Sequence, residues 1–435
     1  MQSAYLDALR QLDTYHRMGR VVRLAGLSIE AKGPDVPVGE VCEIVSRQGK
    51  RLLAEVIGLH EDRIVLMPYG DTRGIAVGSE VLATGHSPEI NVGNALLGRV
   101  VNAFCEPLDD MPAPELTQTR PLRATPINPL SRPPIDQVME TGVRALDGLL
   151  TLGRGQRVGI FAGSGVGKST LLGMIARHIK ADVNVIALIG ERGREVKEFI
   201  DKHLGPEGLK RSVVIVATAD MSALARARAA YAATAIAEFF REQGLQVMLT
   251  MDSVTRFAMA KREIGLAAGE PPTARGYTPS VFTELPELCE RCGTAGTGGS
   301  ITALYTVLVE GDDFNEPISD ILRATLDGHI VLSRKLAHGG HFPAIDVLQS
   351  ASRLLTDLAS ELELGLVRQT VGHLAAYERN REMIDIGAYR AGANAEIDSA
   401  IKLMPGLQRF LRQGSNEHAP RKAILQQLQQ ILGGR

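Results

Sequence analysis

This chain has little of what nucleic-acid-binding proteins use to hold a strand. Its 435 residues include no tryptophan, aromatic residues make up 4% of the chain, and the formal net charge at pH 7 is −2. Proteins that thread single strands stack the bases on aromatic side chains and hold the phosphates in a basic groove. A near-neutral chain also lacks the global field that attracts a phosphate backbone. The composition therefore argues against a nucleic-acid partner.

Cysteines are also few. The four cysteines are not enough for a disulfide framework in a chain of this length. Cys289 and Cys292 form one C-x-x-C pair, and His338 and His341 form a close pair of imidazoles. A closed zinc site needs four ligands in register, and no second cysteine pair follows at zinc spacing. We therefore interpret these residues as helix-end or loop thiols and surface imidazoles, in preference to a metal or redox site.

Long apolar segments are missing as well. No stretch of about 18 apolar residues is present to span a bilayer. The first residues do not combine a basic leader with an apolar run, which a secretory signal requires. Hydrophobic residues make up 44% of the chain and charged residues 23%, as in soluble globular proteins. We expect a cytoplasmic protein.

The chain is too long for one ordinary core, so two or three domains are expected. Residues 1–18 place apolar side chains at three- and four-residue spacing, which predicts an amphipathic helix. Its apolar stripe either packs on its own domain or binds a partner. Residues 19–85 contain short β-rich runs between turn residues, which predicts a small β-barrel or sandwich.

The middle of the chain, residues 86–354, alternates apolar β-rich runs with helical runs and predicts an α/β core around a parallel sheet. Its connection 107–134 holds eight prolines, which exclude a continuous helix or a central strand. Residues 355–435 are predicted to be helical. The strands expected in the core are 158–161, 183–189, 213–217, 247–251, 301–308 and 329–332.

A glycine-rich motif follows the first of these core strands and precedes a predicted helix. Small residues let the backbone curl around phosphate oxygens, while a lysine reaches the β- and γ-phosphates and a hydroxyl ligates Mg²⁺. Because strand, loop, lysine, hydroxyl and helix are all in register, we prefer a nucleoside-triphosphate site to an unrelated turn beside a lysine. The expected phosphate-binding residues are Ala162, Gly163, Ser164, Gly165, Val166, Gly167, Lys168, Ser169 and Thr170.

Two acidic positions at strand ends suggest what the nucleotide is used for. Asp252 ends the predicted strand 247–251, and it either holds the Mg²⁺ hydration shell or caps the helix that follows. The upstream phosphate loop favours the Mg²⁺ role. Glu191 follows the strand 183–189 and is the best candidate to orient the attacking water, with Arg192 beside it near the γ-phosphate. Spacing alone does not separate this role from a solvated run of charges.

Long motifs in this sequence resemble those of the ATPases of type III protein export, which are similar to the catalytic subunit of F-type ATP synthase. The resemblance covers nearly the whole chain and is weakest at its two ends. It implies an α/β fold with a RecA-like P-loop NTPase core, an N-terminal small β-barrel and a C-terminal helical domain. The segments that carry it are 161–169, 191–196, 252–256, 305–313, 326–334 and 343–346.

The resemblance also implies roles for individual residues. Lys168 and Ser169 would bind phosphate and Mg²⁺, Glu191 would activate water with Arg192 beside it, and Asp252 would be the second Mg²⁺-shell group.

Two further positions match residues outside the phosphate loop. Arg353 matches an arginine that reaches the nucleotide of a neighbouring subunit. Phe342 matches an aromatic residue that stacks on adenine; that residue is usually tyrosine, and phenylalanine keeps the ring face. A site completed by its neighbour makes a head-to-tail contact that closes into a ring, so we expect a homohexamer.

The family implies ATP hydrolysis with Mg²⁺, coupled to export of flagellar proteins by a type III secretion apparatus. The expected partners are a coiled-coil negative regulator at the N-terminal helix, a central stalk-like protein, the export gate and chaperone–cargo complexes, at the inner face of the cytoplasmic membrane. Residues 377–382, 386–389 and 269–280 look flagellar, whereas 341–343 and 348–353 are also close to virulence-injectisome ATPases. An injectisome ATPase, a rotary ATP synthase catalytic subunit, an RNA translocase and a nonenzymatic nucleotide-binding subunit are the alternatives.

Overall fold

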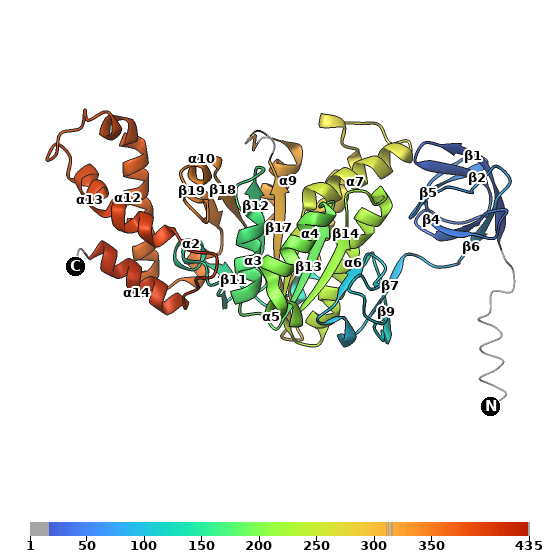
Figure 1. The fold of residues 1–435 in the computed structure, drawn as a ribbon, viewed down its shortest axis with the longest axis horizontal. Helices are drawn as coiled ribbons and strands as arrows, with labels where there is room; N and C mark the ends of the chain where they lie inside the picture. The colour runs from blue at the N-terminus through green and yellow to red at the C-terminus, as the bar shows by residue number, and fades with distance from the viewer. Residues whose placement is uncertain (1–16, 310, 312, 315, 434–435) are drawn as a thin grey trace.

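A computed structural model describes residues 17–309, 311, 313–314 and 316–433 (Figure 1). The molecule is elongated, with a small barrel at one end, a sheet flanked by helices in the middle, and a group of helices at the other end. The helix predicted for residues 1–18 lies outside the described residues except for Arg17 and Met18, and Met18 already starts the first strand.

The N-terminal strands form a closed antiparallel barrel in the order β1-β2-β5-β4-β3-β6. Alternating side chains point inward, so Val21, Ile44 and Val56 are at most 1% exposed and the barrel is filled by its own apolar residues. This confirms the predicted small β-barrel. Its strands are β1 (Met18–Ala25), β2 (Ser28–Lys32), β3 (Val41–Val45), β4 (Arg51–His60), β5 (Arg63–Pro68) and β6 (Glu80–Ala83).

The central sheet has the strand order β19-β18-β12-β17-β15-β13-β14-β8, with β16 paired to β17. Its pairs are parallel except β18 with β19 and β16 with β17. The strands are β8 (Val100–Asn102), β12 (Arg157–Ala162), β13 (Val183–Ile189), β14 (Ser212–Ala217), β15 (Gln246–Asp252), β16 (Gly293–Thr294), β17 (Ser300–Leu308), β18 (Gly328–Leu332) and β19 (Ile345–Ser352).

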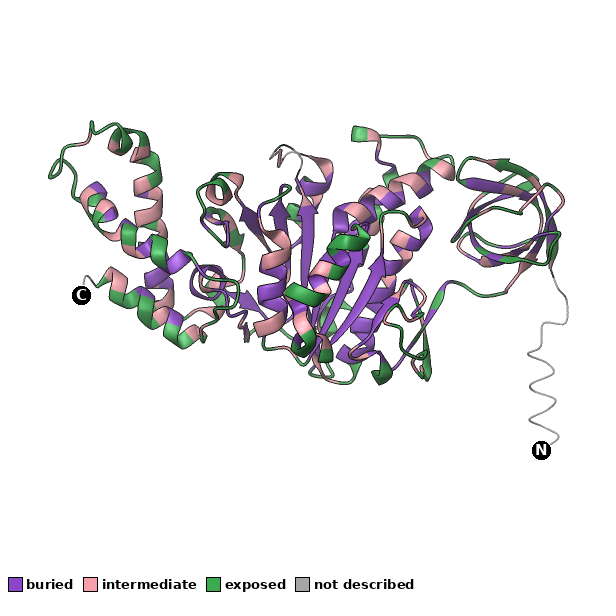
Figure 2. Cartoon of the chain, viewed as in Figure 1, coloured by how far each residue is buried: buried purple, intermediate pink, exposed green. Residues whose placement is uncertain are grey.

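Helices cover both faces of this sheet, which explains why its inner strands are apolar throughout: every residue of β13 is buried. Figure 2 shows the buried strands beneath more exposed helices. The helices of this region are α2 (Arg144–Leu149), α3 (Lys168–His178), α4 (Gly193–Glu198), α5 (Gly205–Lys210), α6 (Ala223–Glu242), α7 (Val254–Ala267), α8 (Pro279–Glu290), α9 (Pro317–Thr325), α10 (Arg334–His338) and α11 (Leu355–Leu358). Shorter helical turns are η1 (Asn94–Leu96), η2 (Pro129–Ser131), η3 (Phe199–Leu204) and η4 (Ala274–Gly276).

All six core strands predicted from the sequence are present, but the two outer strands β8 and β19 were not predicted. β8 has three residues, and most of β19 is half-buried or exposed, so neither shows a continuous apolar run. The proline-rich connection is largely irregular. It contributes β9 (Gln118–Pro121), which pairs with β7 (Glu89–Val92) outside the main sheet, while β10 (Val138–Met139) pairs with β11 (Leu152–Gly153).

The C-terminal region is helical, as predicted from the sequence. Its helices are α12 (Glu361–Asp385), α13 (Ala395–Leu411) and α14 (Arg421–Leu432). They dock on α2 through Phe410 and Ile424, both fully buried. A Cβ on Gly148 of α2 would lie 3.0 Å from Ile424 Cγ2 and 3.2 Å from Phe410 Cζ, so glycine permits this close approach. Among the described residues, no helix combines the length and apolarity that crossing a membrane requires.

Candidate functional site

The glycine-rich loop lies between β12, which ends at Ala162, and α3, which begins at Lys168. Gly165 and Gly167 have φ angles of 77° and 87°, a left-handed conformation that glycine adopts without steric cost. The side chain of Val166 between them is 1% exposed and packs in the core. The buried side chain of Val166 therefore anchors the loop to the core. The start of α3 presents backbone N–H groups and a favourable helix dipole to an anion.

A cavity of about 680 Å³ lies over this loop, in the size range of small-molecule sites. The opposite wall comes from the segment after β13, from α7 and from the start of α10. Of the nine residues predicted to bind phosphate, eight line the cavity and Val166 does not. The eight are Ala162, Gly163, Ser164, Gly165, Gly167, Lys168, Ser169 and Thr170.

Lys168 joins the loop to both predicted acidic residues. Its Nζ lies 2.5 Å from Asp252 Oδ1 and 3.3 Å from Glu191 Oε1. The three side chains come together because β12, β13 and β15 are parallel, so their carboxyl ends meet at one edge of the sheet. A cation between two carboxylates keeps all three side chains in place without a nucleotide.

Burial and the charge of Asp252 raise the pKa of Glu191 to about 7, and Lys168 only partly opposes them. The side chain of Glu191 is 17% exposed and lines the cavity. A carboxyl group with a pKa near neutrality changes protonation at working pH, which suits a group that orients water and accepts a proton. This is a property of the position that the sequence pattern does not show.

Asp252 is the last residue of β15 and is 3% exposed. Thr306 Oγ1 donates a hydrogen bond of 2.7 Å to its Oδ1, the same atom that Lys168 contacts. The alternative interpretation, that Asp252 caps the following helix, is wrong: Ser253 is the N-cap of α7, and its side chain accepts a hydrogen bond from the backbone N–H of Arg256.

Arg192 lies at the open side of the cavity. Its side chain is 83% exposed, and Nη1 lies 3.5 Å from Glu195 Oε1. Its backbone carbonyl accepts hydrogen bonds at the start of α4, so the backbone is fixed while the side chain is held only by a surface contact.

Phe342 and Arg353 occupy different surroundings. Phe342 is 45% exposed, and a Cβ on Gly167 would lie 3.4 Å from its ring, so the ring stands directly beside the phosphate loop. Arg353 is exposed, its Nη2 donates to the Arg323 carbonyl at 2.9 Å, and it is not among the described residues that line the cavity. The structure therefore brings Phe342 to the loop of the same chain and keeps Arg353 away from it.

Arg256 lines the cavity but was not singled out from the sequence. It lies in the first turn of α7, and a Cβ on Gly190 would come within 3.1 Å of three of its side-chain carbons. Gly190 has a φ of 69°, so its lack of a side chain leaves Arg256 room to face the cavity. The available signal was its position four residues after Asp252, within the first turn of the helix that follows.

The cysteine pair and the histidine pair differ in their burial. Cys289 and Cys292 are buried free thiols at the end of α8, and burial raises the pKa of Cys292 to about 11. Tyr305 Oη lies 3.2 Å from Cys292 Sγ. His338 is exposed, but the expectation of a surface imidazole is wrong for His341, which lies in the loop after α10 and is 7% exposed. No cluster of three His, Cys, Asp or Glu side chains suited to a metal occurs in the part of the chain that the structure describes.

Three family models match successive parts of the chain. The ATP synthase alpha/beta family, β-barrel domain, matches residues 21–85, and the nucleotide-binding domain of the same family matches residues 142–352. The T3SS EscN ATPase C-terminal domain matches residues 359–430. The fold and its loop thus define a P-loop ATPase of the ATP synthase alpha/beta type.

Relatives match along the whole length. The flagellum-specific ATP synthase of Bacillus subtilis is 54% identical over 98% of this chain and 98% of its own, and the type 3 secretion system ATPase of Sinorhizobium fredii is 49% identical over 95% and 92%. The assembled ATPase EscN of enteropathogenic E. coli superposes with a TM-score of 0.91 at 45% identity, over 95% of this chain and all of EscN; EscN in complex with its central stalk EscO superposes with 0.88. The chain belongs to the family of flagellum-specific ATP synthases and type III secretion system ATPases.

Proposed function

We propose that this protein hydrolyses ATP to drive the export of flagellar proteins by a type III secretion apparatus, as a ring-forming homo-oligomer. The observation that carries the enzymatic part is the Lys168–Asp252–Glu191 cluster beside the phosphate loop. The flagellar part rests on the names of relatives that are about half identical over the full length of the chain.

In the proposed reaction the triphosphate of ATP lies on the loop, with its γ-phosphate near Lys168. Lys168 leaves the carboxylates and neutralises phosphate charge, and Glu191 then orients a water molecule for in-line attack and takes up its proton. Arg192 and Arg256 add positive charge at the cavity wall. Phe342 supplies a face for the adenine ring beside Gly167.

Mg²⁺ is the proposed metal, and the residues present fit it. Ser169 offers a hydroxyl at the start of α3, and Asp252 offers a carboxylate that Lys168 and Thr306 already hold in position. Hard oxygen ligands of this kind suit Mg²⁺, which also keeps several waters. Ser169 and Asp252 would hold the ion, which when bound would offset the negative charge that develops during phosphoryl transfer.

A homohexameric ring is the proposed assembly. Arg353 is exposed and lies away from the cavity of its own chain, which suits a residue that completes the site of the next subunit. The solved EscN is an assembled ATPase, which supports self-assembly in this chain too.

The remaining partners follow from the family. EscN has been solved with its central stalk EscO, and we propose that a stalk-like protein occupies the ring of this chain as well. Residues 1–18 would bind a coiled-coil negative regulator. Chaperone–cargo complexes and the export gate would meet the ring at the inner face of the cytoplasmic membrane, where the protein acts from the cytoplasm without a nucleic-acid partner.

A virulence injectisome is the second candidate setting, favoured by the C-terminal match to the EscN family model and by EscN itself. Complementation separates the two: restored swimming in a flagellar export mutant supports the flagellar assignment, and rescue of an injectisome mutant alone contradicts it. Hexamers formed by the pure chain would argue against a rotary ATP synthase subunit, and a lack of stimulation by RNA would argue against an RNA translocase.

The first experiment measures the steady-state ATPase rate against protein concentration, for the wild type and for Glu191→Gln. We expect specific activity to rise steeply with concentration in the wild type and to vanish in the variant. A flat, low rate that is equal in both proteins would contradict the proposed function.

A further inference from the structure

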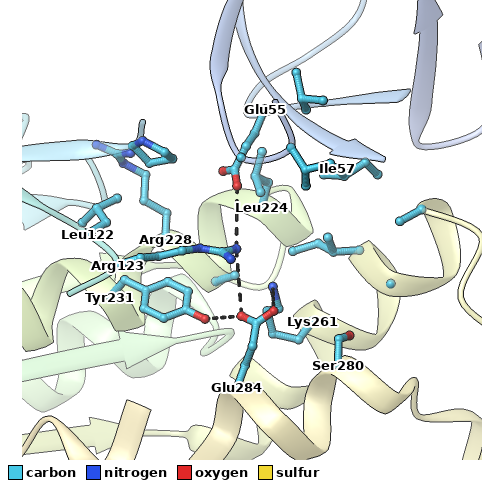
Figure 3. Close-up of a pocket in the computed structure, with 18 of the residues that line it drawn as sticks. Glu55, Ile57, Leu122, Arg123, Leu224, Arg228, Tyr231, Lys261, Ser280 and Glu284 are labelled. Atoms are coloured by element: carbon cyan, nitrogen blue, oxygen red, sulfur yellow. Dashed lines mark hydrogen bonds and ion pairs between the residues drawn. The ribbon is translucent and has the colours of Figure 1, made fainter. Parts of the chain in front are cut away.

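A second cavity, of about 210 Å³, lies where the barrel meets the nucleotide-binding core (Figure 3). Strand β4 forms the wall on the barrel side, and helices α6, α7 and α8 form the wall on the core side. Arg123, from the segment that follows β9, enters between the two walls, and Figure 3 shows it between Glu55 and Glu284.

The barrel contributes a buried carboxylate to this cavity. Glu55 of β4 is 5% exposed, and Tyr69 Oη donates a hydrogen bond of 2.7 Å to its Oε2. The other oxygen, Oε1, lies 3.7 Å from Arg123 Nη2. Among the described residues, Arg123 is the one cation within ion-pair distance of this carboxylate.

The core contributes a second carboxylate with its own cation. Lys261 Nζ of α7 lies 2.8 Å from Glu284 Oε1 of α8, and Tyr231 Oη of α6 donates a hydrogen bond to Glu284 Oε2. Burial acts to raise the pKa of Glu284, but Lys261 and Arg123 outweigh it and hold that pKa below its usual value. Arg123 Nη2 lies 3.9 Å from Glu284 Oε2, and its guanidinium carbon is 5.6 Å from the centre of the Tyr231 ring.

One nitrogen of Arg123 thus lies between a carboxylate of the barrel and a carboxylate of the core. Three carboxylates, Glu55, Glu270 and Glu284, and three cations, Arg123, Arg228 and Lys261, line the cavity, so its charges balance. Lys261 Nζ already forms an ion pair of 2.8 Å with Glu284 Oε1. Without Arg123, Glu55 would be buried with no cation of the described residues within ion-pair distance, and it would face the carboxylate of Glu284 across the cavity, which favours separation of barrel and core.

The cavity is also connected to the nucleotide site by a single helix. Helix α7 begins at Val254, two residues after Asp252, and carries Arg256 to the nucleotide cavity and Lys261 to the barrel junction. A helix is stiff over this distance, so the orientation of the barrel is defined relative to the nucleotide site.

We propose that Arg123 is a positioning residue that bridges Glu55 of the barrel and Glu284 of the core and thereby fixes the barrel for ring assembly. A barrel that is already oriented loses less freedom when both parts of a subunit meet their neighbours, so assembly needs less protein. The assembly part rests on the proposed ring-forming function, and the bridge itself does not.

The direct test measures the distance between barrel and core in the monomer. The four native cysteines are buried, so spin labels react selectively at two introduced, exposed positions, E61C on the barrel and E207C on the core. We expect a narrow distance distribution for the otherwise unchanged chain and a broad one for Arg123→Met. The matched control is Arg51→Met, which removes an exposed ion pair with Glu43 on the same strand β4 without touching the core.

The second readout is the ATPase rate against protein concentration. Arg123→Met should raise the protein concentration at half-maximal rate about tenfold, because it removes the partly buried ion pairs of Arg123 with Glu55 and Glu284. It should leave the plateau rate unchanged, because these pairs lie away from the proposed catalytic site. Arg123→Lys should recover part of both effects, and Glu55→Gln should add little to Arg123→Met because both remove the same bridge.

Equal distance distributions in Arg123→Met, Arg51→Met and wild type would overturn the bridge. So would a fallen plateau rate with unchanged distances, since that places Arg123 in the chemistry. If the wild type shows no concentration dependence, the ring-forming function fails, and the distance distributions alone still decide whether Arg123 joins barrel and core.

Discussion

Replacing Glu191 by glutamine should stabilise the nucleotide-free protein at pH 8 while it abolishes ATPase activity. The pKa of Glu191 is raised from 4.5 to about 7 by burial and by Asp252. Above pH 7 Glu191 is therefore charged in both states, and its charge costs more free energy in the folded protein than in the unfolded chain. The loss of stability is absent below pH 4.5, grows between pH 4.5 and 7, and is constant above pH 7.

The raised pKa corresponds to about 3 kcal/mol of lost stability above pH 7. Because the group borders an open cavity, we expect glutamine to recover about 1–2 kcal/mol of it. Glutamine keeps an oxygen for Lys168 Nζ, now at 3.3 Å from Oε1, so the variant loses the charge without losing the contact. A gain of this size corresponds to a rise in the unfolding midpoint of the core of about 2–4 °C per kcal/mol.

The assay is thermal unfolding without nucleotide or Mg²⁺ at pH 5 and pH 8, with the ATPase rate measured in parallel. The rate should fall by about 10²- to 10⁴-fold. The control is Glu195→Gln: the Glu191 side chain and the Arg192 backbone hold the pKa of Glu195 below its usual value, so its charge is favourable and its loss should not stabilise at pH 8. A gain in Glu191→Gln that is the same at both pH values, or absent at pH 8, would refute the reasoning.

Three further predictions concern other parts of the molecule. Arg353→Ala should lower the ATPase rate of assembled protein on the order of 10³-fold without changing nucleotide binding to the monomer; a rate like that of the wild type contradicts its role in a neighbour's site. Phe342→Ala should raise the KM for ATP and Phe342→Tyr should not, as steady-state kinetics would show, and equal KM values would exclude stacking on adenine. Gly148→Ala should destabilise docking of the C-terminal helices by about 1–3 kcal/mol, because its Cβ would press on Ile424 and Phe410; unchanged hydrogen exchange in those helices would contradict this.

The sequence predicted those parts of the fold whose signal is local. The six buried core strands read as apolar runs, and the phosphate loop could be identified because its glycines, lysine and serine must be consecutive. Strands β8 and β19 were not predicted because a short or half-exposed strand is stabilised mainly by pairing with a neighbouring strand. Such pairing has little effect on the composition of the strand. The raised pKa of Glu191 could not be predicted either, because it depends on burial and on the charge of Asp252, a residue 61 positions away.

Contacts between distant segments were the other unpredicted part. Arg123 belongs to the proline-rich connection, which the sequence describes only as extended, yet its side chain meets both Glu55 and Glu284. Nothing in the spacing of these three residues relates them. Their meeting depends on how the barrel sits on α6, α7 and α8, and that arrangement is a property of packed surfaces.

The order of the strands explains why Phe342 lies beside the phosphate loop and Arg353 does not, although β19 is the one strand between them in the sequence. β18 pairs parallel with β12, so Leu332 lies beside Ala162 at the edge that carries the phosphate loop, and the segment after β18 brings Phe342 to Gly167. β19 then returns antiparallel and ends opposite the start of β18, so Arg353 leaves the sheet at the other edge, the length of a five-residue strand or about 15 Å further on. Arg353, at that edge, does not line the cavity over the phosphate loop of its own chain. The proposed action of Arg353 on a nucleotide therefore requires a second copy that brings its phosphate loop to this arginine, so the proposal of catalysis by Arg353 and the proposal of a ring depend on each other.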